Sequence, residues 1–195
     1  MVVDSAVTGA PRRLVVGLTG SSGPQLGVRL LEVLHERHDV ETHLILSAGS
    51  SESLRLEMDR TPESVAKLAD VCYGVGNLAA AVSSGSFVTA GMAVIPCSMR
   101  TLGAIASGVT GDLVSRAADV CLKERRRLVL VPRETPLNLI HLRNMETLTL
   151  AGATILPPVP AFYHRPRTIE DLLDHVVGKV LDQFGIEHDL FDRWG

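Results

Sequence analysis

"LTGSSGPQLGVRLLE", residues 18–32, follows an apolar run typical of a buried strand and opens an amphipathic helix. Glycines and hydroxyl residues crowd the turn between the two. A strand that passes through so tight a turn into a helix is the first unit of an α/β sheet. Glycine lets a backbone approach a ligand closely and serines donate hydrogen bonds, although a tight turn also needs glycine for steric reasons alone. The turn therefore indicates either a ligand site or only a sharp change of chain direction.

The rest of the chain repeats this alternation. Short runs rich in Val, Ile and Leu predict buried parallel strands at 13–18, 41–46, 92–95, 127–131 and 153–156. Helical patterns lie between them, at 24–36, 50–58, 62–70, 99–107, 112–125, 137–150 and 168–184. The predicted fold class is α/β, a doubly wound parallel sheet in a Rossmann- or flavodoxin-like three-layer sandwich.

Composition limits the functional classes. A chain of 195 residues fits a single domain, expected over residues 13–195 after a flexible tail at 1–12. The net charge of -3 and the lack of a basic stripe argue against a nucleic-acid partner. No apolar run approaches the roughly 20 residues of a bilayer helix, and the first residues lack a signal-like apolar core, so no membrane partner and a cytoplasmic location are expected.

The cysteines Cys72, Cys97 and Cys121 match no metal or redox spacing. They are predicted to be buried, reduced thiols, and no metal site is expected.

Ligands of open α/β sheets bind beyond the carboxyl ends of the strands. Hydroxyl residues and arginines collect after the predicted strands, at 19–23, 47, 96–101, 132–135 and 157–165. Helix N-termini with free N–H groups bind anions, and arginine adds a fork suited to phosphate. The sequence therefore predicts a phosphorylated ligand. It lacks both Gly-x-Gly-x-x-Gly and the Gly-Lys-Ser/Thr ending of nucleotide triphosphatases.

Several longer motifs resemble those of one family. They are "GLTGSSG" with "GVRLLE", "SSGSF", "PCSMRTLGAIASG", "RAADVCLKERRRLVLVPRETPL", "HLRNM", "AGATILPPVPAFYHRP" and the ending "DLFDRWG". From Arg13 to Trp194 the chain resembles the UbiX-type flavin prenyltransferases, also described as small subunits of aromatic-acid decarboxylases.

The resemblance implies a metal-independent transferase. It would join a dimethylallyl group from dimethylallyl monophosphate to N5 and C6 of reduced FMN. The product, prenylated FMN, would serve a partner decarboxylase of the UbiD type, as in the ubiquinone pathway. The resemblance also implies a homododecamer with sites at subunit interfaces.

The resemblance further implies roles for individual residues. The FMN-binding positions are Gly20, Ser21, Ser22, Ser47, Ser98, Met99, Arg100, Thr101 and Arg133. The positions that hold the donor phosphate are Arg116, Lys123, Tyr163 and Lys179. The catalytic positions are Ser22, Glu57, Lys123 and Glu134. A buried glutamate beside a hydroxyl can relay protons near neutral pH.

Each set has a structural alternative. Arg116, Asp119 and Lys123 have the spacing of an ordinary solvated ion-pair face on a helix. Tyr163 can simply pack. Ser21, Ala48 and Lys179 depart from the family pattern, and lysine at 179 keeps the charge but not the planar fork of arginine.

Two other functions are alternatives. One is an FMN-dependent decarboxylase of the phosphopantothenoylcysteine or peptidyl-cysteine type, which relies on a histidine after the third strand. No histidine occurs between Leu44 and Ile140, which argues against it. The other is a non-enzymatic flavin carrier, for which Glu57, Glu134 and Lys123 would be dispensable.

Overall fold

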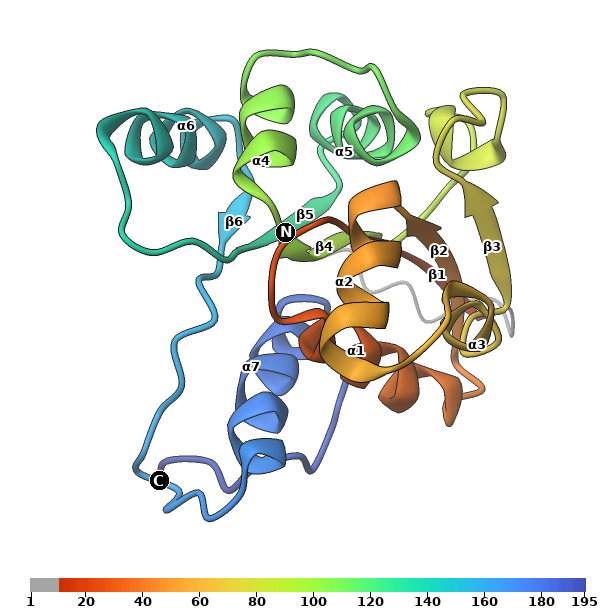
Figure 1. Cartoon of the computed structure of the whole chain (residues 1–195). Helices are drawn as coiled ribbons and strands as arrows, with labels where there is room; N and C mark the ends of the chain where they lie inside the picture. The colour runs from red at the N-terminus through yellow and green to blue at the C-terminus, as the bar shows by residue number, and fades with distance from the viewer. Residues whose placement is uncertain (1–10) are drawn as a thin grey trace.

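The computed structural model describes residues 11–195, which form one parallel sheet with helices on both faces (Figure 1). The strands are β1 (Arg12–Leu18), β2 (Val40–Leu46), β3 (Val71–Gly74), β4 (Gly91–Cys97), β5 (Arg127–Pro132) and β6 (Thr154–Ile155). The helices are α1 (Pro24–His35), α2 (Ala48–Met58), α3 (Pro62–Ala66), α4 (Met99–Ala106), α5 (Leu113–Lys123), α6 (Leu139–Leu150) and α7 (Ile169–Gln183), with a short 3-10 turn, η1 (Ala81–Ser83).

The strand order is β3-β2-β1-β4-β5-β6, and every neighbouring pair is parallel. The order reverses between β1 and β4, so the chain leaves these two adjacent strands toward opposite faces of the sheet. This arrangement confirms the predicted doubly wound sheet. The point of reversal is where such sheets form a ligand crevice.

The side chains of each central strand point alternately to the two faces of the sheet, and the core therefore has two layers, one on each face. In β1, Leu14, Val16 and Leu18 pack into the cluster formed with α1 and α7, whereas Val15 packs into the cluster formed with α4 and α5. Figure 1 shows α4, α5 and α6 along one side of the sheet and α1 and α7 along the other. Because side chains of a strand alternate between faces, strands covered on both faces consist almost entirely of apolar residues.

Two glycines of the stretch 18–32 are required by the structure, one for its backbone conformation and one for a close contact. Gly23 has φ +90°, a conformation that L side chains rarely adopt, and it leads into Pro24 at the start of α1. A Cβ on Gly27 would lie 2.3 Å from the carbonyl oxygen of Ile95. Glycine at this position therefore lets α1 lie directly against β4.

Side-chain caps start the other helices. Ser47, Thr61, Ser98, Asp112, Asn138 and Thr168 each accept a hydrogen bond from a backbone N–H of the first turn of the helix that follows. The predicted cap at Thr61, followed by Pro62, is confirmed. The helix that it starts ends at Ala66, four residues before the predicted end.

The structure differs from the sequence prediction at the sheet edges. β3 was not predicted, and β6 is a half-buried strand of two residues rather than a buried strand over 153–156. Cys72 lies exposed on β3, so the prediction that all three thiols are buried is wrong for this one. Of the predicted tail at 1–12, residues 1–10 lie outside the described residues, and Arg12 already belongs to β1.

Candidate functional site

A cavity of about 630 Å³ opens at the carboxyl ends of the strands. Its lining comes from the loops after β1, β2, β3, β4 and β5 and from the segment between α4 and α5. Six of the nine residues predicted to bind FMN line it, namely Gly20, Ser47, Ser98, Met99, Arg100 and Thr101. The rule that places ligands beyond strand ends therefore located the cavity from sequence.

Thr19 ties together the two loops at the point where the strand order reverses. Its hydroxyl donates to the carbonyl oxygen of Pro96 at 2.8 Å and accepts from the backbone N–H of Ser98 at 2.7 Å. The side chain is buried, so each of these bonds replaces contact with water. The loop after β1 and the start of α4 thus form one rigid edge of the cavity.

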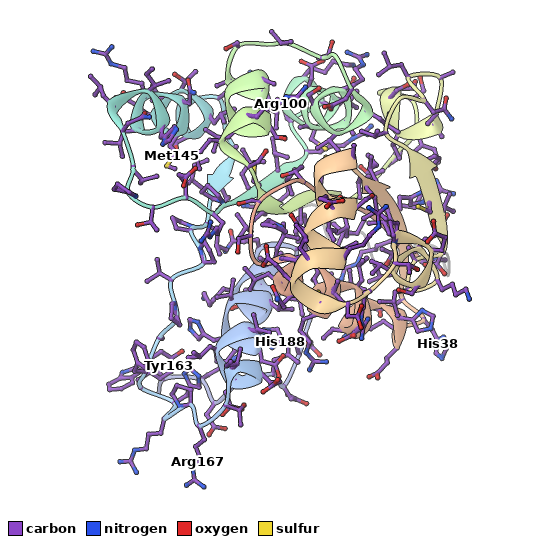
Figure 2. The ribbon with its side chains drawn as sticks, in the orientation of Figure 1. His38, Arg100, Met145, Tyr163, Arg167 and His188 are labelled. Carbon is purple, nitrogen blue, oxygen red and sulfur yellow. The ribbon has the colours of Figure 1, made fainter. Side chains whose placement is uncertain are left out.

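Two helix N-termini face the cavity. Ser47 caps α2 by accepting from the N–H of Ser50 at 3.1 Å, and Ser98 caps α4 by accepting from the N–H of Thr101 at 3.3 Å. The partial positive charge of a helix N-terminus favours an anion. Both predicted serines therefore act first as caps, and Arg100 adds a formal positive charge beside the second helix (Figure 2).

Close backbone contact joins the loops after β1 and β2. A Cβ on Gly20 would lie 2.8 Å from the Cα of Gly49, which is closer than real Cβ atoms come. Side chains at either position would push the loops apart. These glycines therefore keep the floor of the cavity narrow and its backbone accessible.

The remaining predicted FMN residues lie next to the cavity. The Ser21 hydroxyl donates to the backbone carbonyl of Arg133 at 2.8 Å, which links the loops after β1 and β5. The Arg133 side chain is exposed, and the described residues give it no salt bridge.

Ser22 and Glu57 form a hydrogen-bonded pair. Ser22 Oγ donates to Glu57 Oε2 at 3.0 Å, and the backbone N–H of Gly23 donates to the same oxygen at 3.0 Å. The pair joins the C-terminal part of α2 to the start of α1. Its geometry suits a proton path between a hydroxyl and a carboxylate.

Glu134 contributes a second carboxylate, at the wall formed by the loop after β5. It lines the cavity, and its Oε1 accepts from the backbone N–H of Thr135 at 3.0 Å. The expectation of a buried glutamate is wrong for the single chain, because both Glu57 and Glu134 are exposed in it. Glu57 lies on α2 and Glu134 lies in the loop after β5, so neither belongs to a strand of the sheet.

The four residues predicted to hold the donor phosphate fall into two separate groups. On α5, Arg116 donates to Asp119 at 2.7 Å and to the carbonyl of Ser83 at 3.1 Å, and Lys123 pairs with Glu124. Within one chain, the ion-pair alternative therefore describes this face of α5.

The second group lies at the other end of the molecule. Tyr163 packs edge-on against Trp194, with ring centroids 5.5 Å apart, and Lys179 of α7 pairs with Asp182 at 3.1 Å. Figure 2 shows Tyr163 on the extended segment between β6 and α7, far from Arg100. The single chain does not bring the four residues together.

Sequence reasoning missed part of the cavity wall. Val75, Ala104, Val109, Gly111, Asp112 and Ser115 also line it. Asp112 and Ser115 form a capping box, with the N–H of Ser115 donating to Asp112 Oδ1 at 2.8 Å. The D-x-x-S pattern before an apolar run was a usable signal for the pair. No sequence signal indicated Val75, because this residue follows the unpredicted strand β3.

Between residues 11 and 195 no cluster of three or more His, Cys, Asp and Glu side chains is arranged to hold a metal ion. Within the same residues no helix has both the length and the apolar character needed to span a bilayer.

Comparison with known proteins identifies the family. The flavoprotein family model matches residues 4–181. Flavin prenyltransferase PAD1 of Saccharomyces cerevisiae, described as mitochondrial, is 53% identical over 184 residues, which cover 94% of this chain and 76% of the yeast protein.

Two crystal structures closely match the fold. AnUbiX (PadA1), solved in complex with FMN and dimethylallyl pyrophosphate, is 54% identical with a TM-score of 0.93, over 95% of this chain and 98% of that one. A dodecameric FMN-dependent UbiX-like decarboxylase from Escherichia coli O157:H7 is 52% identical with a TM-score of 0.92, over 94% and 99% of the two chains. The chain belongs to the flavoprotein family and, within it, to the UbiX-type flavin prenyltransferases.

Proposed function

We propose that this chain transfers a dimethylallyl group from dimethylallyl monophosphate to N5 and C6 of reduced FMN. The observation that carries the proposal is the cavity at the reversal of strand order, whose lining includes two helix N-termini and Arg100. A relative 54% identical to this chain was crystallised with FMN and a dimethylallyl donor. The function rests on this combination of a fitting cavity and a family whose members carry out the reaction.

The cavity fits a flavin nucleotide in size and chemistry. Its volume of about 630 Å³ lies within the range usual for small-molecule sites. The N-terminal amides of α2 and α4, with Arg100 and Arg133, would hold the anionic part of FMN. Val75, Ala104 and Val109 supply an apolar wall suited to a ring system.

The chain would contribute orientation, electrostatics and proton transfer. Reduced FMN supplies the nucleophile, and the prenyl phosphate supplies the carbon that is attacked. Ser22 Oγ and Glu57 Oε2 would move a proton along the hydrogen bond between them, and Glu134 would serve as a second proton acceptor from the cavity wall.

The leaving phosphate needs cations around it. Arg116, Lys123 and Lys179, together with the Tyr163 hydroxyl, would stabilise the negative charge that grows as the carbon–oxygen bond breaks. Since one chain holds these residues in two separate groups, the proposal requires that copies of the chain meet at the site. A dodecamer, as described for the Escherichia coli relative, is the proposed assembly.

The biological setting follows from the product. Prenylated FMN would serve as cofactor for a UbiD-type decarboxylase, and residues 13–195 would form the flavin-binding domain.

We propose a cytoplasmic location, in keeping with the free thiols of Cys97 and Cys121. Burial raises the pKa of both to about 12, so they remain protonated and unreactive. Fractionation of the source cells tests the location.

The direct test is anaerobic incubation of the protein with reduced FMN and dimethylallyl monophosphate, followed by mass analysis of the flavin. The proposal predicts a flavin heavier by one C5H8 unit. An unchanged flavin mass, with FMN shown to be bound, would rule out prenyl transfer and favour a flavin carrier.

A further inference from the structure

A second hollow lies at the opposite end of the sheet from the flavin cavity. It has a volume of about 700 Å³ and is lined by Arg12, Ala90, Arg125, Arg126, Arg127, Gly152, Asp182, Gln183, Phe184 and Gly185. These residues surround the amino ends of β1, β4 and β5. Because β1 spans the sheet with seven residues at about 3.3 Å each, roughly 20 Å separates the two sites.

Four arginines line this hollow, and within residues 11–195 none of them forms a salt bridge. Arg12 donates to the carbonyl oxygens of Phe184 and Gly185 at 3.2 and 3.4 Å. Arg126 donates to the carbonyls of Phe87 and Gly85. Neutral carbonyls orient these two side chains, and Arg12 and Arg126 act on the carboxylates of Asp39 and Glu124 only through the electrostatic field, without forming an ion pair.

The single carboxylate among the lining residues is already engaged. Asp182 accepts from Arg193 at 2.7 Å and from Lys179 at 3.1 Å. These hydrogen bonds, that from Arg193 most strongly, lower the pKa of Asp182 to about 2, so it is fully ionised and matched by its own two cations. The hollow as a whole is therefore positively charged.

Arg125 stands where the backbone favours a different residue. It has φ +57°, and the N–H of Arg126 closes the end of α5 by donating to the carbonyl of Cys121 at 2.8 Å. Helices usually place glycine at such a left-handed position, because a Cβ is unfavourable there. The Arg125 side chain is therefore present at a cost to the backbone, and glycine could replace it without that cost.

We propose that this hollow binds a small molecule that carries a diphosphate group. A planar guanidinium group can donate two parallel hydrogen bonds to phosphate oxygens, and several arginines without a salt bridge around one hollow suit an anion with several charges. The site is separate from the flavin cavity, and the proposal does not depend on prenyl transfer.

The test is calorimetric titration of the full-length, FMN-loaded protein with inorganic pyrophosphate, inorganic phosphate and ADP. Wild-type protein is expected to bind pyrophosphate at least tenfold more tightly than phosphate. Only binding that is weakened by substitutions in the hollow supports the site: ADP as well as pyrophosphate would then assign the diphosphate of a larger molecule, and pyrophosphate alone would assign the free ion. Pyrophosphate binding that these substitutions leave unchanged belongs to the residues predicted to hold the donor phosphate and counts against the proposal.

Two variants locate the binding. Arg125→Gly suits the left-handed backbone and should leave the melting temperature equal or higher while weakening pyrophosphate binding at least tenfold. Arg127→Gln should weaken it similarly, and Arg55→Gln, which removes an exposed arginine of α2 outside both sites, should not. Wild-type affinity in both hollow variants, or no pyrophosphate binding by wild-type protein, would overturn the proposal.

Discussion

Thr19 shows at the scale of one residue how the sequence builds the flavin cavity. A hydroxyl on a buried side chain both donates and accepts, and so joins the loops that follow two different strands. Sequence reasoning placed this residue in the loop after the first strand. It could not show the two bonds, because their partners lie more than 70 residues away along the chain.

Replacement of Thr19 by valine tests this link. Thr19→Val keeps the shape but leaves the N–H of Ser98 without its acceptor, so the free energy of unfolding should fall by about 1–3 kcal/mol. FMN affinity should fall as well, because the start of α4 loses its anchor. Urea unfolding and flavin titration measure the two effects.

Ser64→Ala on α3 is the control for this prediction. Its exposed hydroxyl donates only to the carbonyl of Thr61, three residues earlier, so its loss should cost less than about 0.5 kcal/mol. Equal effects of the two variants would contradict the role given to Thr19.

Glu57 is the residue on which the proposed proton transfer depends most. Glu57→Gln retains the size of the side chain and removes its charge, and the rate of prenyl transfer should fall about 10²- to 10⁴-fold with FMN affinity little changed. Single-turnover kinetics with reduced FMN measure this rate. Glu52→Gln, on the exposed face of the same helix, should leave the rate unchanged. A Glu57→Gln rate within a factor of three of wild type would exclude a catalytic role.

At the scale of elements, the sequence predicted the central strands and all seven helices but not the edge of the sheet. Central strands have apolar residues on both faces, so their patterns are strong. β3 has only four residues, of which Val71 and Tyr73 are half-buried, and it pairs with β2 alone. Such a strand resembles loop in sequence, and the part of the cavity wall that depends on it was missed for the same reason.

The C-terminal tail is held to α7 by an ion pair whose strength depends on pH. Arg193, most strongly, and Lys179 lower the pKa of Asp182 to about 2. A carboxylate with a lowered pKa stabilises the fold above its unfolded-state pKa of about 4, and this contribution is lost as the pH falls toward about 2.

Asp182→Asn removes this contribution. The variant should be less stable than wild type by about 1–2 kcal/mol near neutral pH, and the difference should shrink between about pH 4 and about pH 2. Chemical unfolding of both proteins across this range measures it. A difference that stays constant down to about pH 3 would contradict this account of the tail.

At the scale of the whole molecule, the apolar surface indicates assembly. On α6, the side chains of Leu139, Ile140, Leu142 and Leu150 are each at least half exposed, and Leu148 is the one buried residue of the helix. A helix that exposes so much apolar surface in a monomer is expected to pack against another chain. The sequence predicted the helix, but the direction of its apolar face required the fold.

Ile140→Glu tests the assembly. The charge would have to be desolvated in an interface, so the variant should elute well below the mass of twelve 20.9-kDa chains, about 250 kDa, that the proposal gives wild type. Light scattering during gel filtration measures the mass. Ile140→Val keeps the surface apolar and should assemble normally. An Ile140→Glu protein of wild-type mass would place α6 outside the interfaces.

The central claim is that the strand-end loops and α5 of one chain form a single site with the segment after β6 and helix α7 of another. A crystal structure of the assembled protein soaked with FMN tests this claim most directly. The account predicts flavin in the cavity between the N-termini of α2 and α4. It also predicts Tyr163 and Lys179 of one copy beside Arg116 and Lys123 of a neighbouring copy. Flavin bound elsewhere, or these four side chains facing separate regions of solvent in the assembly, would contradict it.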